Sequence, residues 1–243
     1  MTFLEIRAFI YGFENRHCEV LLRKEVPQQA TDNLTLLDGW AQKTVMTVGY
    51  DLKHTSRWEC EICGTPAREM WIDPRPSLNI SEPLVVLHVH HVCEAGGGPC
   101  HTEVQNRARE LALKAGGALP APSMPLPKPS DAELPLASSC AKCEEEKTGA
   151  LGFPISRCSR CKLIRQVQLS IKCQTEDWPR HGKICKMIKE VKWGNEEQAL
   201  ATNPESHSET SSRTAGTSRL EIIQTIIAAF ICLAAAIYYM RAG

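Results

Sequence analysis

The chain has 243 residues, enough for one or two small domains with linkers and too few for a large enzyme fold. Its 28 Lys and Arg residues balance its 28 Asp and Glu residues, so the net charge indicates neither a nucleic acid nor an acidic substrate as partner. Ten of the 12 cysteines lie between Cys60 and Cys185, many in Cys-x-x-Cys pairs, which is typical of metal ligands rather than of a disulfide framework.

The first residues do not resemble a secretory signal. Met1–Phe13 contains Glu5 and Arg7 and lacks the long apolar run and small-residue cleavage site of such a signal. Disulfides form mainly in oxidising compartments. We therefore expect the cysteines to be reduced thiolates that bind Zn²⁺.

Residues 1–56 form an N-terminal segment of unknown role, because their hydropathy pattern is weak. A helix is suggested through Asp38–Thr47. Its apolar face would consist of five side chains: Leu34, Leu36, Leu37, Trp40 and Val45. No function is predicted for this segment.

Residues 57–117 have the pattern of a small zinc module that holds one ion. A Cys60-x-x-Cys63 turn precedes a short strand-like segment, Glu69–Ile72, and an apolar, β-rich run, Leu84–Val92. A metal knuckle, two strands and then a helix is the order of elements in a treble-clef finger. We expect that arrangement here.

The helix of this module is predicted over Glu103–Lys114. Thr102 and Gln105 have the spacing of a capping box, and a pair of glycines after the segment can end the helix. Cys100 lies just before this helix, where backbone amides favour a thiolate.

The predicted zinc ligands of this first module are Cys60, Cys63, Cys93 and Cys100. His91 could replace one of these cysteines. His88 and His90 alternate along the predicted strand, and the simpler interpretation is that they form its solvated face.

Residues 118–139 are predicted to be a proline-rich linker. The prolines between Pro120 and Pro135 each fix φ and remove a backbone donor, so this segment should be stiff and extended. It should separate the first module from a second block of cysteines.

The second block, residues 140–185, also has metal-ligand spacing. Its candidate ligands are Cys140, Cys143, Cys158, Cys161, Cys173, His181 and Cys185. A two-residue gap lets both thiolates of a pair reach one tetrahedral ion, and the step from His181 to Cys185 places both side chains on one helical face. The spacing alone predicts zinc.

The order Cys-x-x-Cys, Cys-x-x-Cys-Lys and Cys-Gln-x-x-x-Trp-x-x-His-x-x-x-Cys is similar to the MYND zinc finger, over about a fifth of the chain. The resemblance implies two Zn²⁺ ions with interleaved ligands. It assigns one ion to Cys158, Cys161, His181 and Cys185. It assigns the other to Cys140, Cys143, Cys173 and one more cysteine, four residues before Cys173.

The chain departs from the family pattern at that last position, which is Leu169. The first finger site therefore has three visible ligands, and water or a carboxylate from Glu144–Glu146 could complete it. It could also be empty, or the segment Gln166–Leu169 could reflect an error in the gene model. A three-ligand zinc could in principle be catalytic, but no general base or dry cleft is apparent, and we expect a structural site.

The end of the chain predicts a membrane anchor. Residues 186–220 are predicted to be a short charged helix, Met187–Trp193, followed by a flexible tether. Residues 221–240 are predicted to span a bilayer, since Ile222–Met240 has no charged side chain and is about 28 Å long as a helix. A tail anchor in the mitochondrial outer membrane or the endoplasmic reticulum, with a cytosolic N-terminus, is expected.

The resemblance to MYND fingers implies a function as an adaptor that docks proline-containing peptides of partner proteins. Trp178 is the candidate peptide contact, and residues 157–192 carry ten Lys and Arg against three acidic residues. The basic residues could equally form a solvated helix surface or attract anionic lipid.

Three alternative functions remain in view: a RING-like ubiquitin ligase, part of a lysine-methyltransferase system, or a nucleic-acid-binding protein. A RING has about twice the ligands of residues 60–100, a methyltransferase SET domain needs well over a hundred further residues, and the aromatic spacing for nucleic acids is sparse. We expect no enzymatic activity.

The expected fold class is small α+β zinc-stabilised modules, treble-clef-like and MYND, joined by a Pro-rich linker, plus one C-terminal transmembrane helix.

Overall fold

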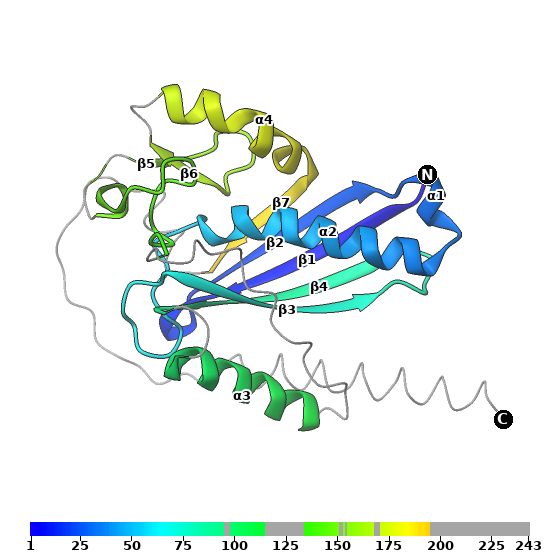
Figure 1. Ribbon diagram of the computed structural model, residues 1–243, viewed down its shortest axis with the longest axis horizontal. Helices are drawn as coiled ribbons and strands as arrows, with labels where there is room; N and C mark the ends of the chain where they lie inside the picture. Colours follow the sequence, from blue (N-terminus) through cyan, green and yellow to red (C-terminus); the bar gives the residue numbers. More distant parts are fainter. Residues whose placement is uncertain (95–97, 115–133, 151–152, 154, 168–170, 195–243) are drawn as a thin grey trace.

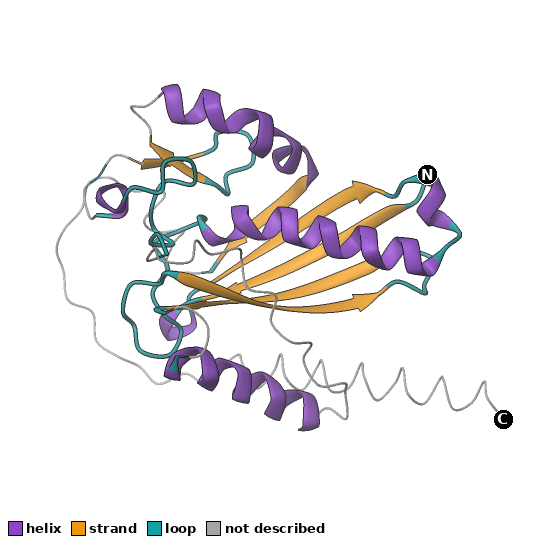
Figure 2. Cartoon of the chain, in the orientation of Figure 1, coloured by secondary structure: helices purple, strands orange, loops and turns teal. Residues whose placement is uncertain are grey.

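The computed structural model describes residues 1–94, 98–114, 134–150, 153, 155–167 and 171–194. The fold is α+β, with a five-stranded sheet and a separate two-stranded sheet (Figures 1 and 2). In chain order the elements are β1 (Phe3–Tyr11), η1 (Phe13–Asn15), β2 (His17–Glu25), α1 (Gln28–Thr31), α2 (Leu34–Lys53), β3 (Glu69–Ser77), β4 (Leu84–Val92), α3 (Pro99–Lys114), η2 (Glu146–Gly149), β5 (Ile155–Arg157), β6 (Arg165–Val167), α4 (Ile171–Met187) and β7 (Ile188–Trp193).

The large sheet has the strand order β3-β4-β1-β2-β7. β1 and β2 form an antiparallel hairpin, β4 joins β1 in parallel, and β3 and β7 are antiparallel edge strands. Between β2 and β3 the chain passes through α2, which lies along one face of the sheet (Figure 1).

The N-terminal segment lies at the centre of this sheet. Leu4, Ile6, Ala8 and Ile10 alternate along β1 and are fully or almost fully buried. They pack in one core with the apolar stripe of α2, in which Leu37, Ala41, Val45, Val48 and Leu52 recur at helical spacing. Residues 1–56, for which no role was predicted, therefore contain β1 and α2, which build much of the main core.

Helix α2 is longer than the predicted Asp38–Thr47 segment. It begins after Asn33, whose side-chain oxygen accepts a hydrogen bond from the Leu36 amide at 3.0 Å. The predicted apolar face is correct for Leu37 and Val45, which are buried, and for Trp40, which packs against the core partly buried. It is wrong for Leu34 and Leu36, which are exposed because they lie in the first turn, beyond the edge of the core.

Residues 140–185, which we call the finger, share this core rather than forming a separate small module. Leu163, Ile164 and Ile184 of the finger are buried in the same cluster as β1 and α2. Residues 188–193, predicted as part of a charged helix, instead form β7, in which Val191 pairs with Val20 of β2. Pairing with a distant strand overrides the local helical preference there.

Two further boundaries differ from the predictions. The described end of the expected linker is packed, since Ala137 is fully buried and its amide donates to the Ala67 carbonyl at 2.8 Å. Helix α3 begins at Pro99, a residue type that suits the first turn of a helix, so Cys100 lies within the helix and the Thr102 hydroxyl bonds the Gly98 carbonyl instead of capping. Strand β4, by contrast, has the predicted bounds Leu84–Val92.

In the described part of the chain, no helix has both the length and the apolar character needed to cross a bilayer. The predicted span, residues 221–240, lies outside that part, as do residues 118–133 of the linker and Leu169.

Candidate functional site

The structure brings the predicted metal ligands together in three groups, within each of which the donor atoms lie within 4.8 Å of one another. We call them the N-terminal cluster (Cys60, Cys63, Cys93, Cys100), the four-ligand finger cluster (Cys158, Cys161, His181, Cys185) and the three-cysteine cluster (Cys140, Cys143, Cys173). The described cysteines are all free thiols. Each group could therefore hold a metal ion.

In the N-terminal cluster, a tight knuckle carries the first two cysteines. The Cys60 amide donates to the Thr65 carbonyl at 2.7 Å and the Gly64 amide to the Cys60 carbonyl at 2.9 Å. Gly64 has a φ of 74°, a left-handed conformation that favours glycine. Cys93 follows β4, and its sulfur lies 3.7 Å from that of Cys63.

This S–S distance matches metal geometry. Two sulfurs at about 2.3 Å from one tetrahedral ion lie about 3.8 Å from each other, whereas a disulfide would bring them to about 2.05 Å. The hydroxyl of Thr65 and its backbone lower the pKa of the Cys63 thiol to about 6, while burial raises the pKa of Cys93 and Cys100. One of the cysteines is thus readily available as a thiolate.

The neighbouring histidines are not part of the N-terminal cluster. His91 is fully buried and stacks on Trp58, so it does not replace a cysteine. His88 and His90 are not a simple solvated face, because the Tyr11 hydroxyl lies 3.0 Å from His88 Nδ1 and a Glu61 carboxylate oxygen 2.6 Å from His90 Nδ1.

The four-ligand finger cluster also has the dimensions of a tetrahedral site. The Cys158 and Cys185 sulfurs are 4.0 Å apart, and His181 Nε2 lies 3.6 Å from the Cys161 sulfur. For a shared zinc ion the expected S–S and N–S separations are about 3.8 and 3.6 Å. Helix α4 supplies the last two ligands from one face, as the i, i+4 spacing predicted.

The ionisable side chains of this cluster shift one another's pKa values. The Cys161 and His181 side chains lower the pKa of the Cys158 thiol to about 3. Burial lowers the pKa of His181, but the Asp51 carboxylate and the Cys158 thiolate outweigh burial and raise it to about 9. Asp51 lies in α2, 130 residues before His181, and no local sequence pattern indicates this contact.

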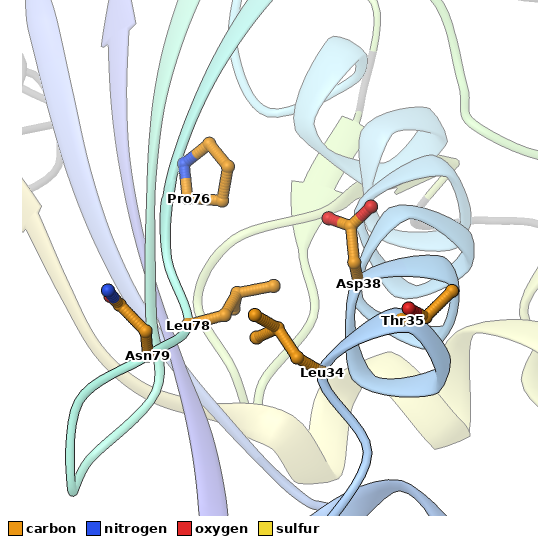
Figure 3. A pocket seen from close by; sticks show the side chains of 6 residues that line it. All are labelled: Leu34, Thr35, Asp38, Pro76, Leu78 and Asn79. Atoms are coloured by element: carbon orange, nitrogen blue, oxygen red, sulfur yellow. The ribbon is translucent and has the colours of Figure 1, made fainter.

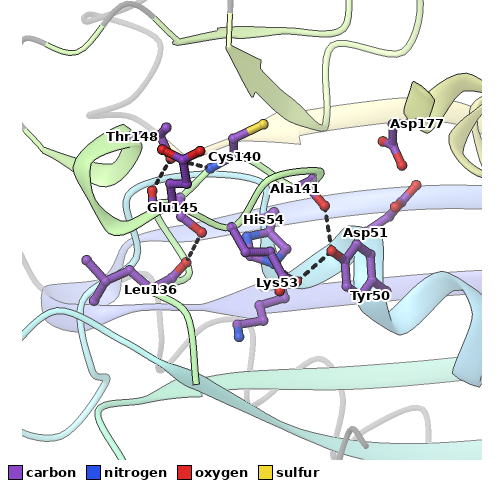
Figure 4. Close-up of polar contacts among 12 residues, drawn as sticks. Tyr50, Asp51, Lys53, His54, Leu136, Cys140, Ala141, Glu145, Thr148 and Asp177 are labelled. Carbon is purple, nitrogen blue, oxygen red and sulfur yellow. Dashed lines mark hydrogen bonds and ion pairs between the residues drawn. The ribbon is translucent and has the colours of Figure 1, made fainter. Parts of the chain in front are cut away.

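In the three-cysteine cluster, no fourth Cys, His, Asp or Glu donor from the described residues joins Cys140, Cys143 and Cys173. Each of the three glutamates considered as a substitute bonds elsewhere. Glu144 lies 2.6 Å from the Tyr50 hydroxyl, Glu145 pairs with Lys147, and Glu146 pairs with Arg68. Figure 4 shows the Cys140 knuckle beside the end of α2, with its sulfur directed away from His54.

The predicted peptide contact, Trp178, lies on α4 with 48% of its surface exposed. Its indole lies over Gly182, where an added Cβ would approach the ring to 3.2 Å, and meets His181 edge-on with centroids 6.2 Å apart. Gly182 therefore allows the ring to lie close to the helix, next to the four-ligand finger cluster.

A shallow hollow of about 390 Å³ lies at the start of α2 (Figure 3). Leu34, Asp38, Leu78 and Asn79 are among the residues that line it. It contains none of the predicted site residues. The candidate site is therefore the set of cysteine clusters rather than this hollow.

No family model matches this chain, and the comparisons with curated proteins and with solved structures also find no match.

Proposed function

We propose that this protein is a zinc-binding, membrane-anchored adaptor without enzymatic activity, and that residues 140–185 act as a MYND-type finger that docks proline-containing peptides. The observation that carries the proposal is the four-ligand finger cluster, whose donor spacing fits one tetrahedral ion, next to an exposed tryptophan.

Zinc suits the donor sets better than Mg²⁺ or Ca²⁺ does. Thiolates and imidazole are its usual ligands, and four protein ligands around one ion are typical of structural sites. Mg²⁺ and Ca²⁺ prefer oxygen ligands. The N-terminal cluster, with four cysteines, would hold a second structural zinc ion.

The surface around Trp178 supports a docking role. Seven of the ten Lys and Arg residues between 157 and 192 are exposed, against the exposed acids Glu176 and Glu190. The other three basic residues are engaged within the protein. Arg157 stacks on Trp193 and Arg165 is buried. Arg180 pairs with Asp51 and Asp177. An exposed indole within a stretch that is rich in exposed basic residues suits a peptide that combines proline with acidic residues.

The anchor belongs to the same proposal. The uncharged run Ile222–Met240 supports it by composition alone. We expect a fluorescent fusion of residues 211–243 to reach an intracellular membrane and to resist carbonate extraction. Diffuse fluorescence of this fusion would remove the anchor from the proposed function.

The docking proposal is tested by titrating the full chain, in mild detergent, with a proline-rich peptide and following resonances or fluorescence near Trp178. Trp178→Ala should abolish the response. Leu111→Ala, which removes an exposed apolar side chain on α3, should leave it unchanged.

Anionic vesicles are titrated in parallel. Binding to vesicles by charge attraction should disappear at high salt before peptide docking does, because exposed charges are screened. If millimolar peptide produces no response around Trp178, the docking role is wrong.

A further inference from the structure

The carboxylate of Asp51 is fully buried, near the end of helix α2 and against the finger. A buried carboxylate is costly unless both oxygens are paired. Asp51 satisfies this condition entirely through α4, since one oxygen accepts from His181 Nδ1 at 2.9 Å and the other from Arg180. Helix α2 thus contacts a predicted zinc ligand, His181, directly.

The contact fixes which nitrogen of His181 faces the cluster. When Nδ1 carries the proton that it donates to Asp51, the neutral ring leaves Nε2 as the acceptor. Nε2 is the atom that lies 3.6 Å from the Cys161 sulfur. The geometry therefore holds the imidazole in the orientation that a metal on Nε2 needs and favours the tautomer with its proton on Nδ1.

The need to neutralise the charge of Arg180 does not by itself explain why a carboxylate is buried at position 51. Asp177 already binds the same guanidinium through both carboxylate oxygens, at 2.8 and 2.9 Å, and the guanidinium also stacks over Tyr50 at 4.5 Å. The Asp51 oxygen on His181 is separate from that arrangement.

The residue before Asp51 makes a parallel link to the other finger cluster. The Tyr50 hydroxyl lies within hydrogen-bond distance of the Ala141 carbonyl, inside the Cys140–Cys143 knuckle, and of the Glu144 carboxylate. Figure 4 shows Tyr50 and Asp51 side by side, with the knuckle on one side and Asp177 of α4 on the other. Consecutive residues of α2 therefore reach both cysteine clusters of the finger.

We propose that Asp51 is a positioning residue for the four-ligand finger cluster: a carboxylate supplied from outside the finger that orients His181 and slows loss of the metal. The inference rests on the proposed zinc site. Outer carboxylates on metal-bound histidines typically contribute about 10- to 100-fold to metal affinity.

The test uses the full chain in three variants, Asp51→Ala, Asp51→Asn and the matched control Asp177→Asn. Zinc transfer to a chelator is timed, and cadmium-substituted samples are studied by NMR, because a site with three sulfurs and one nitrogen gives a resonance distinct from that of a four-sulfur site. The His181 ring nitrogens are followed in the same samples.

Asp51→Ala should speed zinc loss from the four-ligand finger cluster about 10- to 100-fold and shift its cadmium resonance. Asp51→Asn keeps an oxygen that can accept a hydrogen bond from Nδ1. Its rate of zinc loss should therefore lie between those of the unaltered chain and Asp51→Ala. Asp177→Asn, which leaves the contact with His181 in place, should release zinc at the unaltered rate.

One outcome would refute the positioning role and leave the zinc site standing. In it, the unaltered chain shows the three-sulfur, one-nitrogen resonance, while Asp51→Ala and Asp51→Asn release zinc as slowly as the unaltered chain does. If the unaltered chain shows no such resonance, the zinc site itself is wrong. Should Asp51→Ala fail to fold, the comparison of Asp51→Asn with Asp177→Asn decides the question.

Discussion

At the scale of single residues, two fully buried histidines of the described chain, His54 and His91, should make stability fall in acid, and neither belongs to a metal cluster. His54 ends α2, is fully buried and lies with Nε2 3.9 Å from a Glu144 oxygen. Burial, with the nearby Lys53 charge, lowers its pKa from 6.5 to about 3. Since the unfolded chain binds this proton more readily, stability is fully present above about pH 6.5 and is lost as the pH falls towards about 3.

We therefore expect His54→Gln to flatten the acid side of the stability profile. The unaltered chain should lose up to about 1.4 kcal/mol per pH unit from this histidine between those two pH values. Chemical denaturation at several pH values measures it. Protonation of the cysteine clusters affects both proteins, so the difference between them isolates His54, and parallel profiles would show that His54 does not titrate in this way.

Also at this scale, the two finger clusters should respond differently to loss of one cysteine. Cys158 belongs to a group of four donors and Cys140 to a group of three. A structural zinc contributes on the order of 10 kcal/mol to folding, and removing one of four ligands loses much of that. Cys158→Ala should therefore lower the melting temperature and zinc content of the full chain more than Cys140→Ala.

Equal damage from Cys140→Ala and Cys158→Ala would mean that a further ligand completes the three-cysteine cluster. Replacing Gln166–Leu169 with Tyr-Cys restores the spacing and the cysteine of the family pattern. This change should add one bound zinc per chain if Leu169 is the reason for the missing ligand.

At the scale of the elements, α2 positions the site, and its start depends on a cap. The Asn33 side chain satisfies the Leu36 amide, which would otherwise lack an intrahelical partner. Asn33→Ala should cost about 1 kcal/mol in the free energy of unfolding, and Asn33→Gly only a few tenths. Denaturant midpoints measure this, and an unchanged midpoint for Asn33→Ala would show that the cap contributes nothing.

The sequence predicted elements well where the local pattern and the tertiary environment agreed. Strand β4 was recognised because Leu84–Val92 is rich in Val and Leu, residue types that favour strands. Strand β1 was missed although Leu4, Ile6, Ala8 and Ile10 alternate strictly, a period-two signal visible in the sequence. Strand β7 was mistaken for a helix because its charged residues suit a helix, and only its pairing with β2 decides otherwise.

The site was predicted in part for the same reason. Cysteine spacing is local, so all eleven proposed ligands fall in the three clusters. Asp51, Tyr50 and the partners of His90 come from distant segments and were not predicted. Their roles depend on the packing of α2 and β4 against the cysteine knuckles, which spacing does not reveal.

At the scale of the whole molecule, the stability of the finger should depend on its packing against α2 and the large sheet. Its buried Leu163, Ile164 and Ile184 pack into the common core, and Asp51 contacts its histidine ligand. An excised fragment, residues 134–194, should therefore release zinc faster and melt at a lower temperature than the full chain. Equal zinc retention by the fragment would establish an autonomous finger and contradict the shared core.

Two groups of four donors, the N-terminal cluster and the four-ligand finger cluster, are proposed to hold structural zinc. The most direct measurement is the number of zinc ions per full chain by native mass spectrometry, before and after brief exposure to a chelator. We predict two retained ions, with one lost in Cys60→Ala and a different one lost in Cys158→Ala. A chain that folds without bound zinc, or that retains both ions in both variants, would contradict the account.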